Sequence, residues 1–185
     1  MKYYVVKYEG PFGFIKPWTA VRDGETFSQQ FLTPSIVEGM RQKLEVKKIL
    51  RHKLTYQTMS RQQEVTQSRG WKVLRKQKML IRPTAILDRM VLLEPTLFLA
   101  FETLEEAQQA YKQHLCLCRN EDLVFPAEMI LELTENEFNQ LAGFELRFGE
   151  NEQSFLVGYN RFKGNAPMYG WLEVSNNPLK NNEEI

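Results

Sequence analysis

The pattern of apolar and polar positions in the first fifty residues predicts one strand followed by one helix. Residues 2–8 are apolar on both faces and rich in β-branched and aromatic side chains, as expected of a strand in the middle of a sheet. A helix is expected to begin near Thr33, because Pro34 suits a first turn and Ser35 with Glu38 has the spacing of a capping box. The positions spaced for the buried face of this helix are Ile36, Val37, Met40 and Leu44.

The pattern in the middle of the chain predicts three further strands, with a polar segment between the first and the second. Residues 48–56 and 96–101 have the composition of strands, and the second run, TLFLAF, is apolar enough to be central. Residues 79–93 alternate loosely and predict another strand, broken near Pro83. Residues 57–78 contain few aliphatic side chains and many basic residues and glutamines, so we expect a protruding hairpin or mobile loop outside the core.

The last part of the chain predicts two more helices and three short strands. The second helix is capped by Thr103 and Glu106, and the third begins at Thr134 with Glu137 three residues on, which is again a capping box. The buried stripe of the second helix is expected to be Leu104, Ala107, Tyr111 and Leu115. The short strands are expected at residues 144–148, 154–158 and 169–174. Because the order contains two strand–helix–strand units, it predicts an α+β, ferredoxin-like antiparallel sheet with helices on one face.

The composition is that of one globular domain. The chain has 185 residues, of which 43% are hydrophobic and 25% charged, and this excludes wholesale disorder. We expect a single domain over residues 1–174 and a polar, frayed tail over 175–185. No apolar run approaches the ~20 residues of a membrane span, and the first residues lack a signal peptide, which predicts a soluble, cytoplasmic protein. Cys116 and Cys118 are too close for a disulfide and lack partners for zinc, so no metal or cofactor is expected.

The charge is distributed unevenly along the chain. The formal net charge is +1, but residues 41–82 contain thirteen Lys or Arg and two acidic residues, whereas residues 83–185 contain seven basic and seventeen acidic residues. A local positive field of this size attracts a polyanion. Tyr56, Trp71 and several glutamines lie among the basic residues, and aromatic rings stack on bases while lysines contact phosphates. The pattern therefore favours binding to nucleic acid, and to RNA in particular.

Candidate RNA-binding residues come from the basic region and from the long irregular segment that precedes the first helix, since such segments usually carry function in a compact domain. They are Lys16, Trp18, Arg22, Lys48, Arg51, Lys53, Arg61, Arg69, Trp71, Lys72, Arg75, Lys76 and Lys78. Structural roles in turns, caps and packing are expected for Gly10, Gly13, Thr33, Pro34, Ser35 and Gly39. Glycine inside a helix costs about 1 kcal/mol relative to alanine, so Gly39 predicts a packing or ligand reason.

Two other functions fit the same residues. A metal-independent endoribonuclease needs a base for a 2′-hydroxyl, an acid and a cation for the strained phosphate, and His52, Lys53 and Tyr56 supply these residue types. A lone histidine on a strand is more often structural. The basic region could instead dock on an acidic protein partner without any RNA.

The first 44 residues resemble the fifth CRISPR-associated (Cas) protein family. This family is a branch of the RAMP superfamily, and its members are small subunits of Cascade-type complexes. The resemblance rests on the strand KYYVVKY, the turn GPFGFIKPW and the segment ETFSQQFLTPSIVEGM. The matching positions are Gly10, Pro11, Lys16, Pro17, Thr33, Pro34, Ser35 and Gly39.

The resemblance implies a non-catalytic, RRM-like RAMP palm that binds the 5′ handle of a CRISPR RNA in antiviral defence. It also implies a hairpin thumb, here residues 57–78, that contacts other subunits of the effector complex. Superfamily members often carry a glycine-rich RNA-contacting loop near the C-terminus, where this chain has Gly158, Gly164 and Gly170. One branch of the family cleaves CRISPR repeats, which is the nuclease alternative, and a decoy that imitates a Cascade subunit is the protein-binding alternative.

Overall fold

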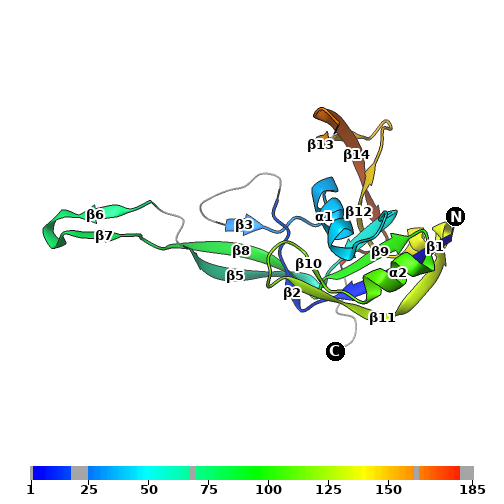
Figure 1. Cartoon of the computed structure of the whole chain (residues 1–185), viewed down its shortest axis with the longest axis horizontal. Coiled ribbons are helices and arrows are strands. Elements are labelled where there is room, and N and C mark those ends of the chain that lie inside the picture. Colours follow the sequence, from blue (N-terminus) through cyan, green and yellow to red (C-terminus); the bar gives the residue numbers. More distant parts are fainter. Residues whose placement is uncertain (1, 18–24, 67–69, 161–162, 180–185) are drawn as a thin grey trace.

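The computed structural model describes residues 2–17, 25–66, 70–160 and 163–179, and within them a central sheet carries a long hairpin and a smaller projecting ribbon (Figure 1). The strands of the central sheet are β1 (Lys2–Glu9), β4 (Arg51–Thr55), β9 (Thr96–Phe101), β10 (Leu115–Cys116), β11 (Leu123–Thr134), β12 (Gly143–Phe148), β13 (Phe155–Asn160) and β14 (Ala166–Ser175). The helices are α1 (Pro34–Leu44), α2 (Leu104–Tyr111) and α3 (Glu135–Gln140). The hairpin and its neighbours are β2 (Phe12–Gly13), β3 (Glu25–Phe27), β5 (Thr58–Thr66), β6 (Lys72–Leu74), β7 (Met79–Ile81) and β8 (Ala85–Leu93).

The central sheet confirms the α+β class. Its strand order is β10-β11-β1-β9-β4-β12-β14-β13, and β1 pairs antiparallel with both β11 and β9. β9 in turn pairs antiparallel with β4. The predictions of central strands at 2–8 and 96–101 are therefore confirmed. We call β10, β11, β1, β9 and β4, together with the helices, the palm, and β13 and β14 the ribbon.

The two faces of the palm sheet are covered by different helices. Val6 and Tyr8 on β1 pack with the buried residues of α1 and α2, because alternate residues of a strand share a face. Tyr3 and Val5 point the other way and pack with Phe138 of α3, whose ring meets that of Tyr3 at 5.7 Å. The expectation of helices on one face is therefore wrong for α3, which covers the opposite face.

The helix caps follow the sequence with one exception. At α1 the N-cap is Thr33, whose side chain accepts from the backbone N–H of Ile36 at 3.4 Å, and Pro34 occupies the first turn. The predicted Ser35–Glu38 capping box is wrong, because Ser35 lies inside the helix and Glu38 instead accepts two hydrogen bonds from Arg41. Thr103 caps α2, and the predicted capping box of Thr134 and Glu137 is present at α3.

The buried face of α1 is confirmed, but that of α2 is not. In α1, Val37, Met40 and Leu44 are buried and Ile36 packs partly against the core. In α2 the buried residues are Ala107 and Ala110, whereas Leu104 and Tyr111 are 40% and 39% exposed. The last expected member, Leu115, lies beyond the end of the helix in β10. α2 has eight residues, and the two that pack in the core are its alanines.

The described residues between 58 and 93 form the long hairpin that extends to the left in Figure 1. β5 pairs with β8 over its whole length, from Thr58 opposite Leu93 to Thr66 opposite Ala85, and β6 pairs with β7 beyond it. The described residues of 57–78 supply the outgoing strands β5 and β6 and the turn at the far end of the hairpin. Residues 79–93 were expected as a separate strand, and they are the returning arm, interrupted at Pro83.

Two features of the C-terminal third differ from expectation. The twelve-residue strand β11 was not predicted, because the apolar and acidic residues of this segment do not alternate cleanly. The segment after β14 is held to the palm as far as Leu179: Thr55 donates to the carbonyl of Pro178, and Asn176 to that of Gln140. A frayed tail was expected from Ser175 onward, but residues 175–179 are bound to the palm.

Alanine substitution at Gly10 and at Gly39 should change the stability of the protein in opposite directions. A Cβ on Gly10 would lie 2.3 Å from the carbonyl oxygen of Leu123, so β11 must move, and we expect Gly10→Ala to lower the free energy of unfolding by about 1–3 kcal/mol. No atom lies within 4 Å of a Cβ on Gly39, so the expected packing reason is absent, and Gly39→Ala should raise stability by about 1 kcal/mol. Urea unfolding of the two variants checks both signs.

Equal effects of the two substitutions would contradict the close approach at Gly10. At Gly13 a Cβ would meet the side-chain Cδ1 of Leu117 at 2.3 Å, which can rotate away, so this site is less demanding than Gly10.

Candidate nucleic-acid interface

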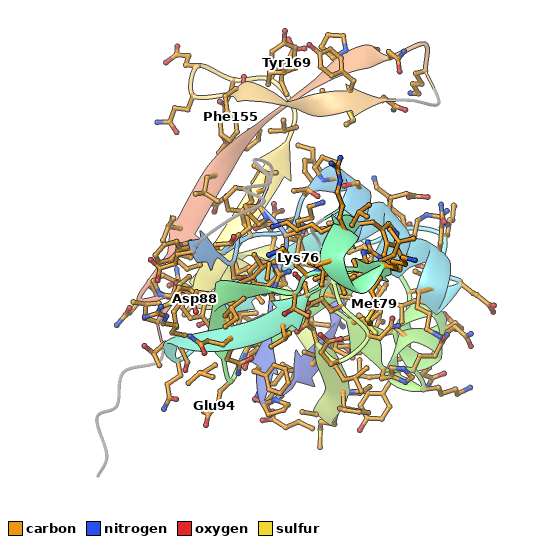
Figure 2. The ribbon with its side chains drawn as sticks, turned by 90° about the vertical axis from the view of Figure 1, so that its left-hand side faces the viewer. Lys76, Met79, Asp88, Glu94, Phe155 and Tyr169 are labelled. Carbon is orange, nitrogen blue, oxygen red and sulfur yellow. The ribbon has the colours of Figure 1, made fainter. Side chains whose placement is uncertain are left out.

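The far end of the hairpin gathers exposed basic and apolar side chains. A short 3-10 turn at Arg75–Gln77 joins β6 to β7, and Lys78 adopts the left-handed conformation that closes it, with φ of 49°. We call residues 71–80 the basic tip, and Figure 2 views the molecule from this end, with Lys76 and Met79 labelled. The exposed side chains of the tip are Trp71, Lys72, Val73, Arg75, Lys76, Lys78, Met79 and Leu80. Trp71, Val73 and Leu80 are each about two-thirds exposed, at 67%, 64% and 64%.

The tip has no acidic neighbour in the sequence between Glu64 and Asp88. Lys72, Arg75, Lys76 and Lys78, all predicted RNA contacts, are exposed near the far end of the hairpin, as is Trp71. Four cations beside an exposed indole can neutralise phosphates and stack on a base. The apolar members Val73, Met79 and Leu80 were missed as interface residues, because their pattern is that of an ordinary strand.

The base of the hairpin differs from its tip, because its basic residues are paired. Arg61 on β5 forms an ion pair with Asp88 on β8, and Arg89 on β8 forms one with Glu64 on β5. Arg61 is a predicted RNA contact and is 60% exposed, but its charge is neutralised by the ion pair with Asp88. The positive field of the hairpin therefore rises toward the tip.

A second basic surface lies on the palm, where α1 ends. Lys43, Lys47 and Lys48 are exposed, and the backbone N–H groups of Lys47 and Lys48 donate to one carboxylate oxygen of Glu106 at 2.8 and 3.3 Å. Lys16 is exposed in the segment after β2. Three further predicted contacts, Trp18, Arg22 and Arg69, lie outside the described residues.

Arg51 and Lys53 are inside the molecule rather than on an RNA-binding surface. Arg51 is 5% exposed and donates to both carboxylate oxygens of Glu145, at 2.6 and 2.7 Å. Lys53 is fully buried, and its ammonium donates to the carbonyls of Asn139 and Leu141 and to Ser175. Burial lowers the pKa of Lys53. These two cations tie β4 to β12, α3 and the end of β14.

The predicted His52, Lys53 and Tyr56 cluster is not assembled at a surface. His52 is 3% exposed and its ring lies 5.9 Å from that of Phe148, while Lys53 points to the opposite face of β4. Tyr56 is buried and stacks on Phe144. Burial, followed by the charges of Arg51 and Arg147, lowers the pKa of His52 to about 3. At neutral pH this imidazole is uncharged and has no access to an RNA 2′-hydroxyl.

The buried imidazole predicts a loss of stability in acid. Unfolded His52 takes up a proton near pH 6.5 and folded His52 only near pH 3, so folding is opposed increasingly as the pH falls between these values. From pH 7 to pH 4.5 this contribution amounts to roughly 2 kcal/mol. His52→Leu should remove it, so urea unfolding of the variant should be less dependent on pH. An unchanged pH dependence in the variant would show that other groups govern acid unfolding.

The described residues contain no group of three or more His, Cys, Asp or Glu side chains placed to hold a metal ion. Cys116 and Cys118 carry free thiols. None of the helices in the described part of the chain is long and apolar enough to cross a membrane.

Comparison with known proteins gives a likeness in fold. No model of a known protein family matches the chain, and no curated protein matches it. Among solved structures, a chain of one titled "CRISPR RNA-guided surveillance complex" superposes with a TM-score of 0.55 and 12% sequence identity, over 95% of this chain and 91% of that one. In fold, over nearly its whole length, this protein is thus similar to a chain of a CRISPR RNA-guided surveillance complex.

Proposed function

We propose that the protein is an RNA-binding subunit of a Cascade-like CRISPR effector complex and that it caps the 5′ handle of the CRISPR RNA. The observation that carries this proposal is the basic tip, which has four exposed cations and an exposed tryptophan and no acidic residue between them. The likeness in fold to a chain of a CRISPR RNA-guided surveillance complex supports the type of assembly.

The topology of the palm supports a ferredoxin-like fold of the RAMP type. The elements β1, α1, β4, β9, α2 and β11 follow one another as β-α-β-β-α-β, apart from the short strands β2, β3 and β10 and the hairpin inserted after β4. Their strands lie in the order β11-β1-β9-β4, all antiparallel. This alternation is the ferredoxin-like arrangement, and the hairpin occupies the position of the thumb.

In the proposed complex the hairpin and the palm hold RNA between them. The cations of the tip neutralise phosphates, and Trp71 stacks on a base that has left the A-form stack. Lys16, Lys43, Lys47 and Lys48 on the palm neutralise further phosphates. The exposed Val73, Met79 and Leu80 supply apolar area for a neighbouring subunit of the complex.

The test uses a cognate CRISPR repeat RNA, labelled at its 5′ end, and a scrambled RNA of equal length. Pure protein and RNA are incubated in EDTA and run on native and denaturing gels side by side. A shift of intact repeat RNA, stronger than that of the scrambled RNA, is expected. A shift of cut RNA would replace handle capping by endonuclease activity, and no shift up to micromolar protein at 0.1 M salt would favour a protein-interaction module.

A further inference from the structure

The hairpin meets the palm at a cluster of one aromatic ring and three charged side chains. Arg89 on β8 donates through Nε to Glu64 on β5, and the Nη1 atom of Arg119 lies 3.8 Å from the same carboxylate. The guanidinium carbons of Arg89 and Arg119 lie 5.0 and 5.5 Å from the centre of the Phe14 ring, which is 2% exposed. We call these four residues the hinge cluster.

One side of the hinge cluster is anchored firmly in the palm. Arg119 lies on the loop between β10 and β11 and binds both carboxylate oxygens of Asp122, at 2.9 and 2.6 Å. Asp122 is fully buried, and its carboxylate also accepts from the backbone N–H of Arg119 at 2.9 Å. Hydrogen bonding to Asp122 raises the pKa of Arg119, which therefore stays charged. Glu64 and Arg89 belong to the hairpin, so the Glu64–Arg119 pair crosses from one part to the other.

We propose that the hinge cluster is a positioning device that fixes the direction in which the hairpin leaves the palm, and so holds the basic tip where it and the palm act on one RNA. This inference rests on the proposed function. Ten residues separate Arg89 from Met79 on the tip, up to about 33 Å at 3.3 Å per residue, so a small rotation at the hinge cluster moves the tip by several ångströms. A tip that is already held in place loses less freedom when RNA binds.

The charge of Glu64 separates positioning from simple electrostatics. Glu64→Gln removes the carboxylate that joins Arg89 and Arg119 and keeps the side-chain size. Glu64 is 40% exposed, so the fold should tolerate the change. The variant gains one positive charge on the hairpin. If Glu64 acts only through the local field, RNA binding becomes tighter; if it positions the hairpin, binding becomes weaker although the charge is more favourable.

The matched control is Asp88→Asn. Asp88 pairs with Arg61, and both residues lie on the same two hairpin strands, β5 and β8. The control therefore adds the same charge at nearly the same distance from the tip without touching Arg119 or Phe14.

The first measurement needs no RNA. Spin labels are placed at Met79→Cys on the tip and Gln108→Cys on α2, both exposed, in a chain whose Cys116 and Cys118 are serine. Pulsed dipolar spectroscopy is expected to give a narrow distribution of label-to-label distances in the labelled protein that keeps Glu64 and in the Asp88→Asn control. In the Glu64→Gln variant the distribution should be clearly broader or shifted. Distributions that coincide for Glu64→Gln and the control would overturn the hinge.

The second measurement titrates repeat RNA with the unlabelled proteins. We expect the Kd of Glu64→Gln to rise roughly three- to tenfold and that of Asp88→Asn to stay equal or fall. A Kd that falls in both variants would overturn the positioning role, whatever the distances show. If even the unchanged protein fails to bind, the proposed function is wrong, and the positioning role for RNA falls with it; the distance distributions then still decide separately whether the cluster fixes the hairpin.

Discussion

Replacing Lys72, Arg75, Lys76 and Lys78 together by glutamine is expected to flatten the salt dependence of RNA binding by about three units. Each phosphate neutralised on single-stranded RNA contributes about 0.7 to the slope of log Kd against log salt concentration, so four lost contacts account for this change. At 0.1 M salt the Kd should rise by about two orders of magnitude. The four side chains are exposed and form no part of the core, so the melting temperature should stay within a few degrees.

The control for this variant neutralises Lys2, Lys112 and Lys163, which are exposed and lie outside the hairpin and α1. Its slope should change by less than one unit, since only the long-range field is altered. Equal changes in slope for the control and the tip variant would mean that net charge governs binding. An unchanged slope in the tip variant would place the RNA on another surface, with the basic side of α1 as the next to test.

The basic hairpin and the palm strands could be predicted because their signals are local. The apolar runs at 2–8 and 96–101 and the caps at Thr103 and Thr134 each depend on a few neighbouring residues, and the structure confirms them. The protrusion of 57–78 followed from the scarcity of aliphatic side chains. Residues 79–93 were predicted as a strand broken near Pro83, and β7 and β8 confirm this prediction. The pairing of β8 with β5 could not be predicted, because the alternation is the same whether these residues pair with β5 or with the palm.

The interior cations could not be predicted because their partners are distant in the sequence. Arg51 meets Glu145 across 94 residues, and Lys53 meets main-chain carbonyls more than 80 residues away. A run of basic residues suggests one exposed surface, but alternation along β4 turns His52 to one face and its two neighbours to the other. The hinge cluster was missed for the same reason, since Phe14, Glu64, Arg89 and Arg119 come from four separate segments.

The second large effect is expected when the buried ion pair of Arg51 and Glu145 is broken. Glu145 is 1% exposed, and Glu145→Gln would leave the buried guanidinium of Arg51 with only the more distant carboxylate of Glu135, 4.0 Å from its Nη1 atom. Breaking such a pair from one side costs about 3–5 kcal/mol, because the remaining charge is desolvated and uncompensated. We expect a loss of this size in the free energy of unfolding measured with urea. The register between β4 and β12 contains one residue pair, Phe144 opposite Leu54, so the ribbon should loosen from the palm first.

The double variant Arg51→Met with Glu145→Met identifies the cause of that loss. Removing both charges eliminates this buried ion pair, and apolar side chains of similar size pack beside Phe138, whose ring lies 5.0 Å from the Arg51 guanidinium carbon. The double variant should therefore recover to within about 1–2 kcal/mol of the unchanged protein. It should also bind repeat RNA with unchanged salt dependence, since Arg51 is buried. A double variant as unstable as Glu145→Gln would mean that the hydrogen-bond geometry, rather than the uncompensated charge, stabilises this junction. A weaker salt dependence of RNA binding in the double variant would mean that Arg51 does contact RNA.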